Sequence, residues 1–209
     1  MAKLLYVESS PRKERSYSIA VAREFLKSYE GAHPHDNIET LDLWSLELPE
    51  FSGDAINAKY KIMHGEPHTA GEAEAWNKVV DVFERFKSAD KYLFSIPMWN
   101  FGIPYKLKHF IDIINQPGLS FSYSPDSGYK GLLSGRTAAV IYSRGGEYSS
   151  GPALSMDFQK RYFEHLLGFI GITNVKSIVI EPTLGGPELA EKAKKEAIQA
   201  ACRVAVKFY

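Results

Sequence analysis

The stretch Lys3-Leu-Leu-Tyr-Val-Glu-Ser-Ser-Pro-Arg-Lys-Glu-Arg-Ser-Tyr-Ser18 decides the fold, because an apolar run gives way to a hydroxyl-rich turn and then to a helical pattern. The turn holds Ser9, Ser10, Ser16 and Ser18 but no glycine. Hydroxyls and backbone N–H groups at the N-terminus of a helix are suited to binding a phosphate. The sequence therefore predicts a strand–loop–helix unit that binds a phosphorylated cofactor, although serines before a helix are also common helix caps.

Further strands and helices alternate along the rest of the chain. The apolar runs that predict strands are Lys3–Glu8, Asn37–Leu43, Lys91–Ile96, Thr137–Ser143 and Val175–Ile180. Apolar residues spaced for one face of a helix lie between these runs, and the last helix is expected from about Pro187 to Phe208. This alternation predicts a parallel sheet covered on both faces. We expect an α/β fold with a doubly wound, five-stranded parallel sheet in the flavodoxin-like order 2-1-3-4-5, in a single domain over residues 1–209.

Local signals set several boundaries. Thr69 and Glu72 have the spacing of a capping box, and Pro104 and Pro187 suit the first position of a helix. Residues 44–70 carry few periodic positions and are expected to form a long irregular insertion. Residues 120–136 are expected to form a hairpin.

Bulk composition limits the classes of partner. Lys plus Arg and Asp plus Glu both number 25, so a net charge of zero gives no electrostatic reason to expect nucleic acid or a membrane surface. No apolar stretch reaches the roughly 18 residues that a membrane span needs, and no charged leader with a cleavage site is present. Cys202 is the only cysteine, which excludes an internal disulfide and favours a reducing compartment, so we expect a cytoplasmic protein.

The expected strand order places any ligand beyond the carboxyl ends of the strands, where three loops meet. The first is the serine loop, Ser9–Ser18. The second, Pro97-Met-Trp-Asn-Phe-Gly-Ile-Pro104, offers an aromatic surface and an amide, and the third, Ser143-Arg-Gly-Gly146, lets backbone N–H groups approach a ligand closely. Each of these loops taken alone is equally well an ordinary turn. Together they predict a site for a phosphate and a planar hydrogen-bonding ring, which describes flavin mononucleotide (FMN).

Other motifs are absent or incomplete. No Gly-x-Gly-x-x-Gly follows the first strand, and neither a Walker sequence nor a Gly-x-Ser-x-Gly elbow occurs. Two histidine pairs, at residues 33 and 35 and at residues 64 and 68, have metal-like spacing, but prolines interrupt them and no acid or thiol cluster joins them, so no metal site is expected. Arg12, Lys13 and Arg15 either form a solvated charged turn or help to attract a phosphate.

The three loops resemble those of the FMN-dependent NADH:azoreductases, which are also described as NADH:quinone oxidoreductases, and the resemblance covers nearly the whole chain. It implies a homodimer with one FMN per subunit at the subunit interface. The residues that it assigns to the phosphate are Ser10, Ser16, Tyr17 and Ser18. Those that it assigns to the flavin ring are Pro97, Met98, Trp99, Asn100, Phe101, Ser143, Arg144, Gly145 and Gly146. It also implies, more weakly, that Tyr123 closes the site from the neighbouring subunit.

Two positions depart from the family. Trp99 stands where tyrosine is common, which removes a phenol, and residues 51–70 do not align, so that only Lys59 and Lys61 are candidates for an arginine that positions substrate in some relatives. The implied reaction passes two electrons from NADH or NADPH through FMN to a quinone or azo compound in ping-pong order, with reductive cleavage of the azo bond. Hydride transfer to a flavin needs no side-chain nucleophile or acid, so no catalytic residue is assigned. The alternatives are a flavodoxin-type electron carrier without NAD(P)H turnover, a reductase of quinones only, and a non-catalytic binding protein.

Overall fold

A computed structural model of the chain describes residues 1–209 and contains the expected parallel sheet. Its strands are β1 (Lys3–Glu8), β2 (Asn37–Asp42), β3 (Lys91–Pro97), β6 (Thr137–Ser143) and β7 (Asn174–Ile180). They lie in the order β2-β1-β3-β6-β7, and every neighbouring pair is parallel. The predicted order 2-1-3-4-5 is therefore confirmed, with strand ends that differ from the predicted ones by at most one residue.

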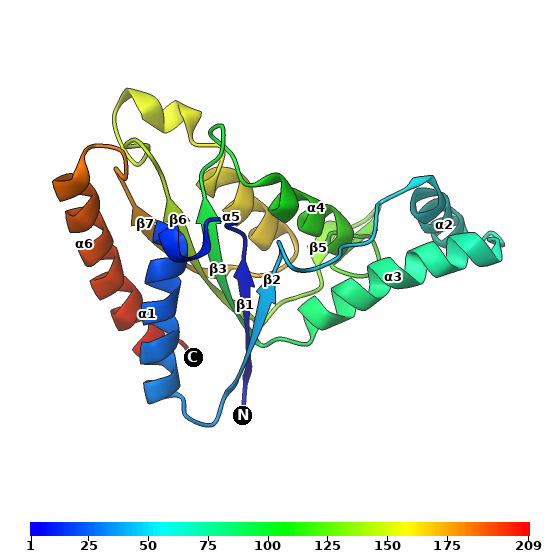
Figure 1. The fold of residues 1–209 in the computed structure, drawn as a ribbon. Coiled ribbons are helices and arrows are strands. Elements are labelled where there is room, and N and C mark those ends of the chain that lie inside the picture. Colours follow the sequence, from blue (N-terminus) through cyan, green and yellow to red (C-terminus); the bar gives the residue numbers. More distant parts are fainter.

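Helices cover both faces of this sheet (Figure 1). One face carries α1 (Tyr17–Ala32) and α6 (Pro187–Val206), and the other carries α3 (Ala70–Lys87), α4 (Tyr105–Ile114) and α5 (Lys160–Phe169). Successive strand residues point to opposite faces, so Leu4 packs in the cluster beneath α1 and Leu5 in the cluster beneath α4 and α5. None of the helices combines the length and the apolar composition needed to cross a membrane.

The insertion after β2 contains a helix that the sequence analysis missed. Helix α2 (Gly53–His64) lies within residues 44–70, so the expectation of an irregular loop is wrong there. Ala55 and Ala58 are its buried residues, and α2 packs against α3, with which it forms a pair that projects away from the sheet (Figure 1). The next helix starts as predicted, because Thr69 and Glu72 make both hydrogen bonds of a capping box.

The second insertion folds as expected into an antiparallel hairpin of β4 (Phe121–Ser124) and β5 (Gly128–Gly131). It packs on the end of α5, where the rings of Phe121 and Phe169 are 4.8 Å apart. Two helix ends differ slightly from prediction, because Pro104 caps α4 from outside and α6 ends at Val206. Two short 3-10 turns, η1 (Lys13–Arg15) and η2 (Pro152–Met156), complete the structure.

Both chain ends lie at the edge of the sheet where the strands begin (Figure 1). Lys91, the first residue of β3, donates from Nζ to the carbonyl oxygen of Phe208 at 2.8 Å and to the hydroxyl of Tyr29 at 3.1 Å. The same ammonium lies 3.3 Å from Oδ2 of Asp36. The other carboxylate oxygen of Asp36, Oδ1, accepts a hydrogen bond from the backbone N–H of Ala2. These contacts fix the two ends of the chain opposite the edge where the strands end.

Candidate functional site

A cleft of about 160 Å³ lies at the carboxyl edge of the sheet, between the loops that follow β1, β3 and β6. All three loops chosen from the sequence contribute to its walls. Its lining residues are Ser10, Arg12, Ser16, Tyr17, Pro97, Met98, Trp99, Ser143, Gly145, Thr183 and Leu184. No carboxylate is among them, so an anionic group in the cleft meets no acidic side chain in its walls.

The serine loop presents hydroxyls at the N-terminus of α1. Ser16 is the N-cap residue, and its Oγ accepts a hydrogen bond from the backbone N–H of Ile19 at 3.5 Å. Ser18 is fully buried, does not line the cleft, and lies with its Oγ 3.2 Å from that of Ser16. The first N–H groups of α1 have no partner within the helix. Ser16 therefore caps the helix, and N–H donors remain at this end of α1, so the two interpretations of this loop are compatible.

The loop after β3 turns sharply beside the cleft. Trp99 and Gly102 exchange backbone hydrogen bonds of 3.1 and 2.9 Å, which forces Asn100 and Phe101 into left-handed conformations with φ of 47° and 68°. Non-glycine residues adopt this conformation at a cost and are concentrated at functional sites. Asn100 and Phe101 are exposed and lie outside the cleft walls, whereas Met98 and Trp99 line them. The backbone N–H of Met98 donates to the carbonyl of Ser143 at 2.8 Å, which joins this loop to the one after β6.

The Arg144 side chain lies away from the cleft, in a buried charge cluster. Its guanidinium is fully buried and donates to Asp157 at 2.7 Å, Gln159 at 3.0 Å and Glu181 at 3.3 Å. Burial raises the pKa of the Glu181 carboxyl, but hydrogen bonds from the loop after β6 and the Arg144 charge outweigh this effect and lower that pKa. Arg144 is therefore not a lining residue of the cleft, and its charge links Asp157 to Glu181, the first residue after β7.

Sequence reasoning missed a fourth wall, formed by the loop after β7. Thr183 donates to the carbonyl of Arg144 from both its backbone N–H and its hydroxyl, each at 2.9 Å, and the backbone N–H of Leu184 donates to the carbonyl of Gly145 at 3.0 Å. The Leu184 side chain lies over Gly145, since a Cβ built on that glycine would be 2.8 Å from Leu184 Cδ1. The sequence could have indicated this wall, because residues 181–186 follow the carboxyl end of a predicted strand and so lie at the same edge of the sheet.

Trp44 is a second residue that was missed. Its indole N–H donates to the carbonyl of Ser9 at 2.9 Å, and its ring centroid lies 5.8 Å from that of Trp99 and 5.3 Å from that of Tyr105. It therefore connects the serine loop to the aromatic loop after β3. Trp44 follows the carboxyl end of β2 by two residues, so the rule that selected the other loops also applied to it.

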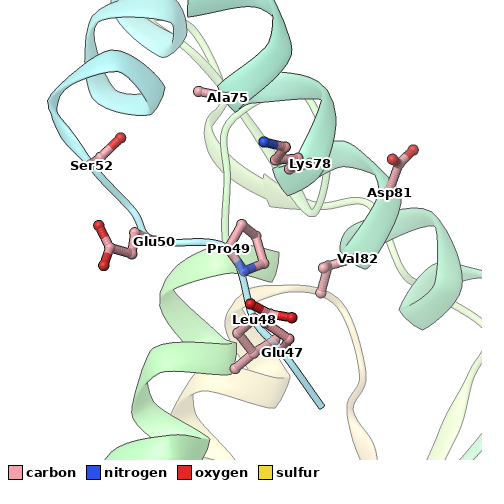
Figure 2. Close-up of a pocket in the computed structure, with 9 residues that line it drawn as sticks. All are labelled: Glu47, Leu48, Pro49, Glu50, Ser52, Ala75, Lys78, Asp81 and Val82. Carbon is pink, nitrogen blue, oxygen red and sulfur yellow. The ribbon is translucent and has the colours of Figure 1, made fainter.

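The remaining candidates lie elsewhere. Tyr123 stands on the hairpin, is 61% exposed and does not line the cleft of its own chain, and Gly146 lies against Tyr148. No group of three or more His, Cys, Asp or Glu side chains is arranged to hold a metal ion. A larger cavity of about 540 Å³ lies between residues 47–52 and α3 (Figure 2), but it shares no residue with the cleft and its walls mix acidic side chains with Lys78.

A hydroxyl-lined helix N-terminus and a glycine-containing loop, both at the carboxyl edge of a 2-1-3-4-5 sheet, define a nucleotide-binding protein of the flavodoxin-like class. Comparison with known proteins agrees with this class. The chain matches the flavodoxin-like fold family over residues 2–204, and it belongs to that family.

Individual relatives are similar over their full length. The chain is 53% identical over 205 residues to an FMN-dependent NADH:quinone oxidoreductase of Desulfotalea psychrophila, covering 96% of this chain and 97% of that protein. It is 50% identical to a protein of the same name from Nitratidesulfovibrio vulgaris, with complete coverage of both. Among solved structures, an azoreductase from Bacillus anthracis superposes with a TM-score of 0.92 at 37% identity and full coverage of both chains. A FMN-dependent NADH-azoreductase of that species, solved in complex with FMN, gives a TM-score of 0.86 at 29% identity over 98% of this chain and 100% of the other. The resemblance stated from the loops is confirmed.

Proposed function

We propose that the protein is an FMN-dependent oxidoreductase that transfers two electrons from NADH to quinones and azo compounds. One observation carries the proposal most directly: a cleft without carboxylates, built by the serine, aromatic and glycine loops, in a chain 53% identical to a protein named for this reaction. The flavodoxin-type carrier is not favoured, because the relatives described above are named as enzymes that use NADH or as azoreductases.

The residues of the cleft fit FMN. In this proposal Ser10 and Ser16, with the first N–H groups of α1, would hold the phosphate, and Arg12, which lines the cleft and has no carboxylate partner, adds positive charge. Met98 and Trp99 offer an apolar and aromatic surface to the ring. The backbone N–H at Gly145, which lines the cleft, would donate to the electron-accepting edge of that ring, where preorganised N–H groups stabilise negative charge.

When bound, FMN supplies the redox chemistry by accepting hydride from the nicotinamide and passing electrons to the acceptor. The chain's contribution is to bind the phosphate, to orient the ring and to exclude water from one face of it. No side chain in the cleft is required to act as a nucleophile or as a general acid, so no catalytic residue is proposed.

We also propose that two copies of the chain complete each site. The cleft of about 160 Å³ is smaller than the roughly 300–1,000 Å³ typical of a ligand site, which leaves room for walls from elsewhere. Tyr123 is exposed on a hairpin outside its own cleft, as an aromatic side chain reaching a neighbouring subunit would be.

The single cysteine favours a reducing compartment, the cytoplasm, for this enzyme.

A visible spectrum of the purified protein tests the proposal. We expect flavin absorption in the protein as isolated or after addition of FMN, bleaching on addition of NADH under argon, and recovery on addition of benzoquinone. Steady consumption of NADH with benzoquinone, and loss of colour from an azo dye, then establish turnover, and NADPH in parallel establishes the donor preference. A protein that shows no flavin absorption after incubation with FMN and removal of the unbound flavin contradicts the proposal. One that binds FMN but shows no steady turnover supports the carrier instead.

A further inference from the structure

Lys13 occupies an unusual position within the serine loop. It adopts a left-handed conformation with φ of 47°, which is uncommon for a residue with a side chain. Its ammonium does not line the cleft but lies 2.6 Å from Oε1 of Glu8 and 2.6 Å from Oδ2 of Asp42. These carboxylates belong to the last residues of β1 and β2, so Lys13 ties the loop to the edge of the sheet beneath it.

Both carboxylates are held in place by further hydrogen bonds. Glu8 Oε2 accepts from the hydroxyl of Tyr6 at 3.3 Å, and that hydroxyl lies 3.0 Å from Oγ of Ser95 on β3. Asp42 accepts from the backbone N–H of Trp44 at 3.1 Å. The two partners of Lys13 therefore lie on the adjacent strands β1 and β2, and their hydrogen bonds extend to Ser95 on β3 through Tyr6 and to Trp44.

The charges of this cluster are unfavourable without Lys13. Glu8 and Asp42 are two negative charges directly below a loop that is proposed to receive a phosphate dianion. Burial lowers the pKa of the Lys13 ammonium, but its bonds to Asp42 and Glu8 outweigh burial and raise that pKa, so the side chain stays charged at neutral pH. Burial likewise raises the pKa of Asp42, and the bonds from Lys13, Ser45 and Trp44 outweigh it and lower that pKa.

The backbone of Lys13 connects the cluster to the cleft. Its carbonyl accepts a hydrogen bond from the backbone N–H of Ser16 at 2.9 Å, which places the N-cap serine of α1. A change at Lys13 therefore alters both the local charge and the position of Ser16. The other two cations of the loop differ, because Arg12 lines the cleft and neither Arg12 nor Arg15 pairs with a carboxylate.

We propose that Lys13 is a positioning residue for the phosphate of the cofactor: its ion pairs with Glu8 and Asp42 hold the left-handed turn that presents Ser16 and neutralise two carboxylates beneath the phosphate. The inference rests on the proposed function in one respect, namely that the ligand of this loop is FMN. It assigns Lys13 no contact with the flavin ring and no role in hydride transfer.

Comparing FMN with riboflavin, which has the same ring but no phosphate, tests this role. Flavin binding to the apoprotein is measured by quenching of flavin fluorescence for the parent and for Lys13→Gln, Lys13→Arg and Lys13→Gly. Lys13→Gln is expected to weaken FMN binding by about tenfold or more, with riboflavin binding changed less than about twofold. Lys13→Arg keeps the charge and is expected to stay close to the parent.

Lys13→Gly separates the charge from the backbone conformation. Glycine adopts positive φ without strain, so this variant relieves the backbone while losing both ion pairs. The proposal expects it to lose FMN affinity as Lys13→Gln does, and it serves as the decisive variant if Lys13→Gln does not fold. FMN binding equal to the parent in Lys13→Gly, or an equal loss of FMN and riboflavin in either variant, would overturn the proposal. A parent protein that binds neither flavin would instead overturn the proposed function.

Discussion

Ser16 caps α1 and is proposed to bind the phosphate, and two measurements on one variant can separate these effects. It caps α1 through its hydroxyl, and the same hydroxyl lies in the wall of the cleft next to Ser18. Helix capping stabilises the fold whether or not a ligand is present, whereas a hydrogen bond to a phosphate acts only on the complex. Comparing the free energy of capping with the free energy of phosphate binding shows whether Ser16 serves mainly the fold or mainly the ligand.

Replacing Ser16 and Ser18 together by alanine is expected to weaken FMN binding. Ser16 lines the cleft, and losing its hydrogen bond to a charged phosphate costs about 1.5–3 kcal/mol, while the lost cap costs about 1 kcal/mol of the free energy of unfolding. Ser18 is buried next to Ser16, so its replacement acts only through the position of the Ser16 hydroxyl. Titration of the apoprotein with FMN measures the first effect and urea unfolding of the apoprotein the second. Riboflavin is the control ligand, and its affinity should change little. Unchanged FMN affinity in the double variant contradicts the phosphate assignment.

Arg144 is expected to matter for stability more than for direct contact with the ligand. Arg144→Met leaves Asp157 and Glu181 without their buried cation, which typically costs about 3–5 kcal/mol. Urea unfolding measures this loss. Arg203→Met, at an exposed arginine of α6, is the matched control and should stay within about 0.5 kcal/mol of the parent. A small effect at Arg144 would mean that water reaches its partners and replaces the guanidinium.

Asp36 gives stability a defined dependence on pH. Hydrogen bonds from the backbone N–H of Ala2 and the hydroxyl of Tyr29, with the Lys91 charge, lower the pKa of its carboxyl to about 2. Because the pKa in the folded protein is lower than in the unfolded chain, the stabilisation is fully present above about pH 4 and is lost as pH falls toward 2. Asp36→Asn should therefore be less stable than the parent at pH 7, and the difference should shrink below pH 4. Thermal unfolding of both proteins between pH 7 and 3 measures this, and a difference that does not change with pH contradicts it.

At the scale of elements, the pair formed by α2 and α3 buries few hydrophobic side chains. Its small cluster contains only Ala55, Val79 and Ile113 as buried hydrophobic residues, although Lys61 on α2 adds an ion pair of 2.8 Å with Glu72 on α3. Glu72 also completes the capping box with Thr69. A single carboxylate thus holds both the start of α3 and its contact with α2.

Thr69→Ala is expected to lower the free energy of unfolding of this helix pair by about 1 kcal/mol. Since the pair projects from the sheet, the loss should appear as faster amide hydrogen exchange in residues 53–75, with little change in the strands. Thr69→Ser keeps an acceptor hydroxyl and is the control. Uniformly faster exchange over the whole chain would show that the pair opens only when the entire protein unfolds.

The elements that the sequence predicted well are those with strong, local patterns. The central strands β1, β3 and β6 are mostly buried apolar runs, and the rule that ligands bind beyond the carboxyl ends of parallel strands selected loops that do meet in one cleft. Helix α2 was missed because it buries only two alanines, which leave almost no periodic hydrophobic signal. The position of the Arg144 side chain was missed because its partners lie 13 and 37 residues further along the chain.

At the scale of the whole molecule, the open side of the cleft and the exposed Tyr123 belong together in the proposed dimer. Light scattering of the purified protein is expected to give twice the mass of one chain. Tyr123→Ala should leave that mass unchanged but raise the KM for a quinone and shift the visible flavin spectrum, because an aromatic wall is lost. Tyr209→Ala, at an exposed tyrosine of the opposite edge, is the control and should change neither quantity. A protein that is monomeric by light scattering and still reduces quinones with steady turnover contradicts the proposal that two chains complete each site.

The position of the chain ends opposite the cleft has a practical consequence. Lys91 holds Phe208, the residue before the last, at the edge where the strands begin, and the N-terminus lies at the same edge (Figure 1). A tag or a chemical tether attached at either end would therefore orient the molecule on a bead or an electrode with its reactive opening toward the solution. Immobilised preparations of this protein should consequently remain accessible to bulky dyes that a random attachment through surface lysines would block.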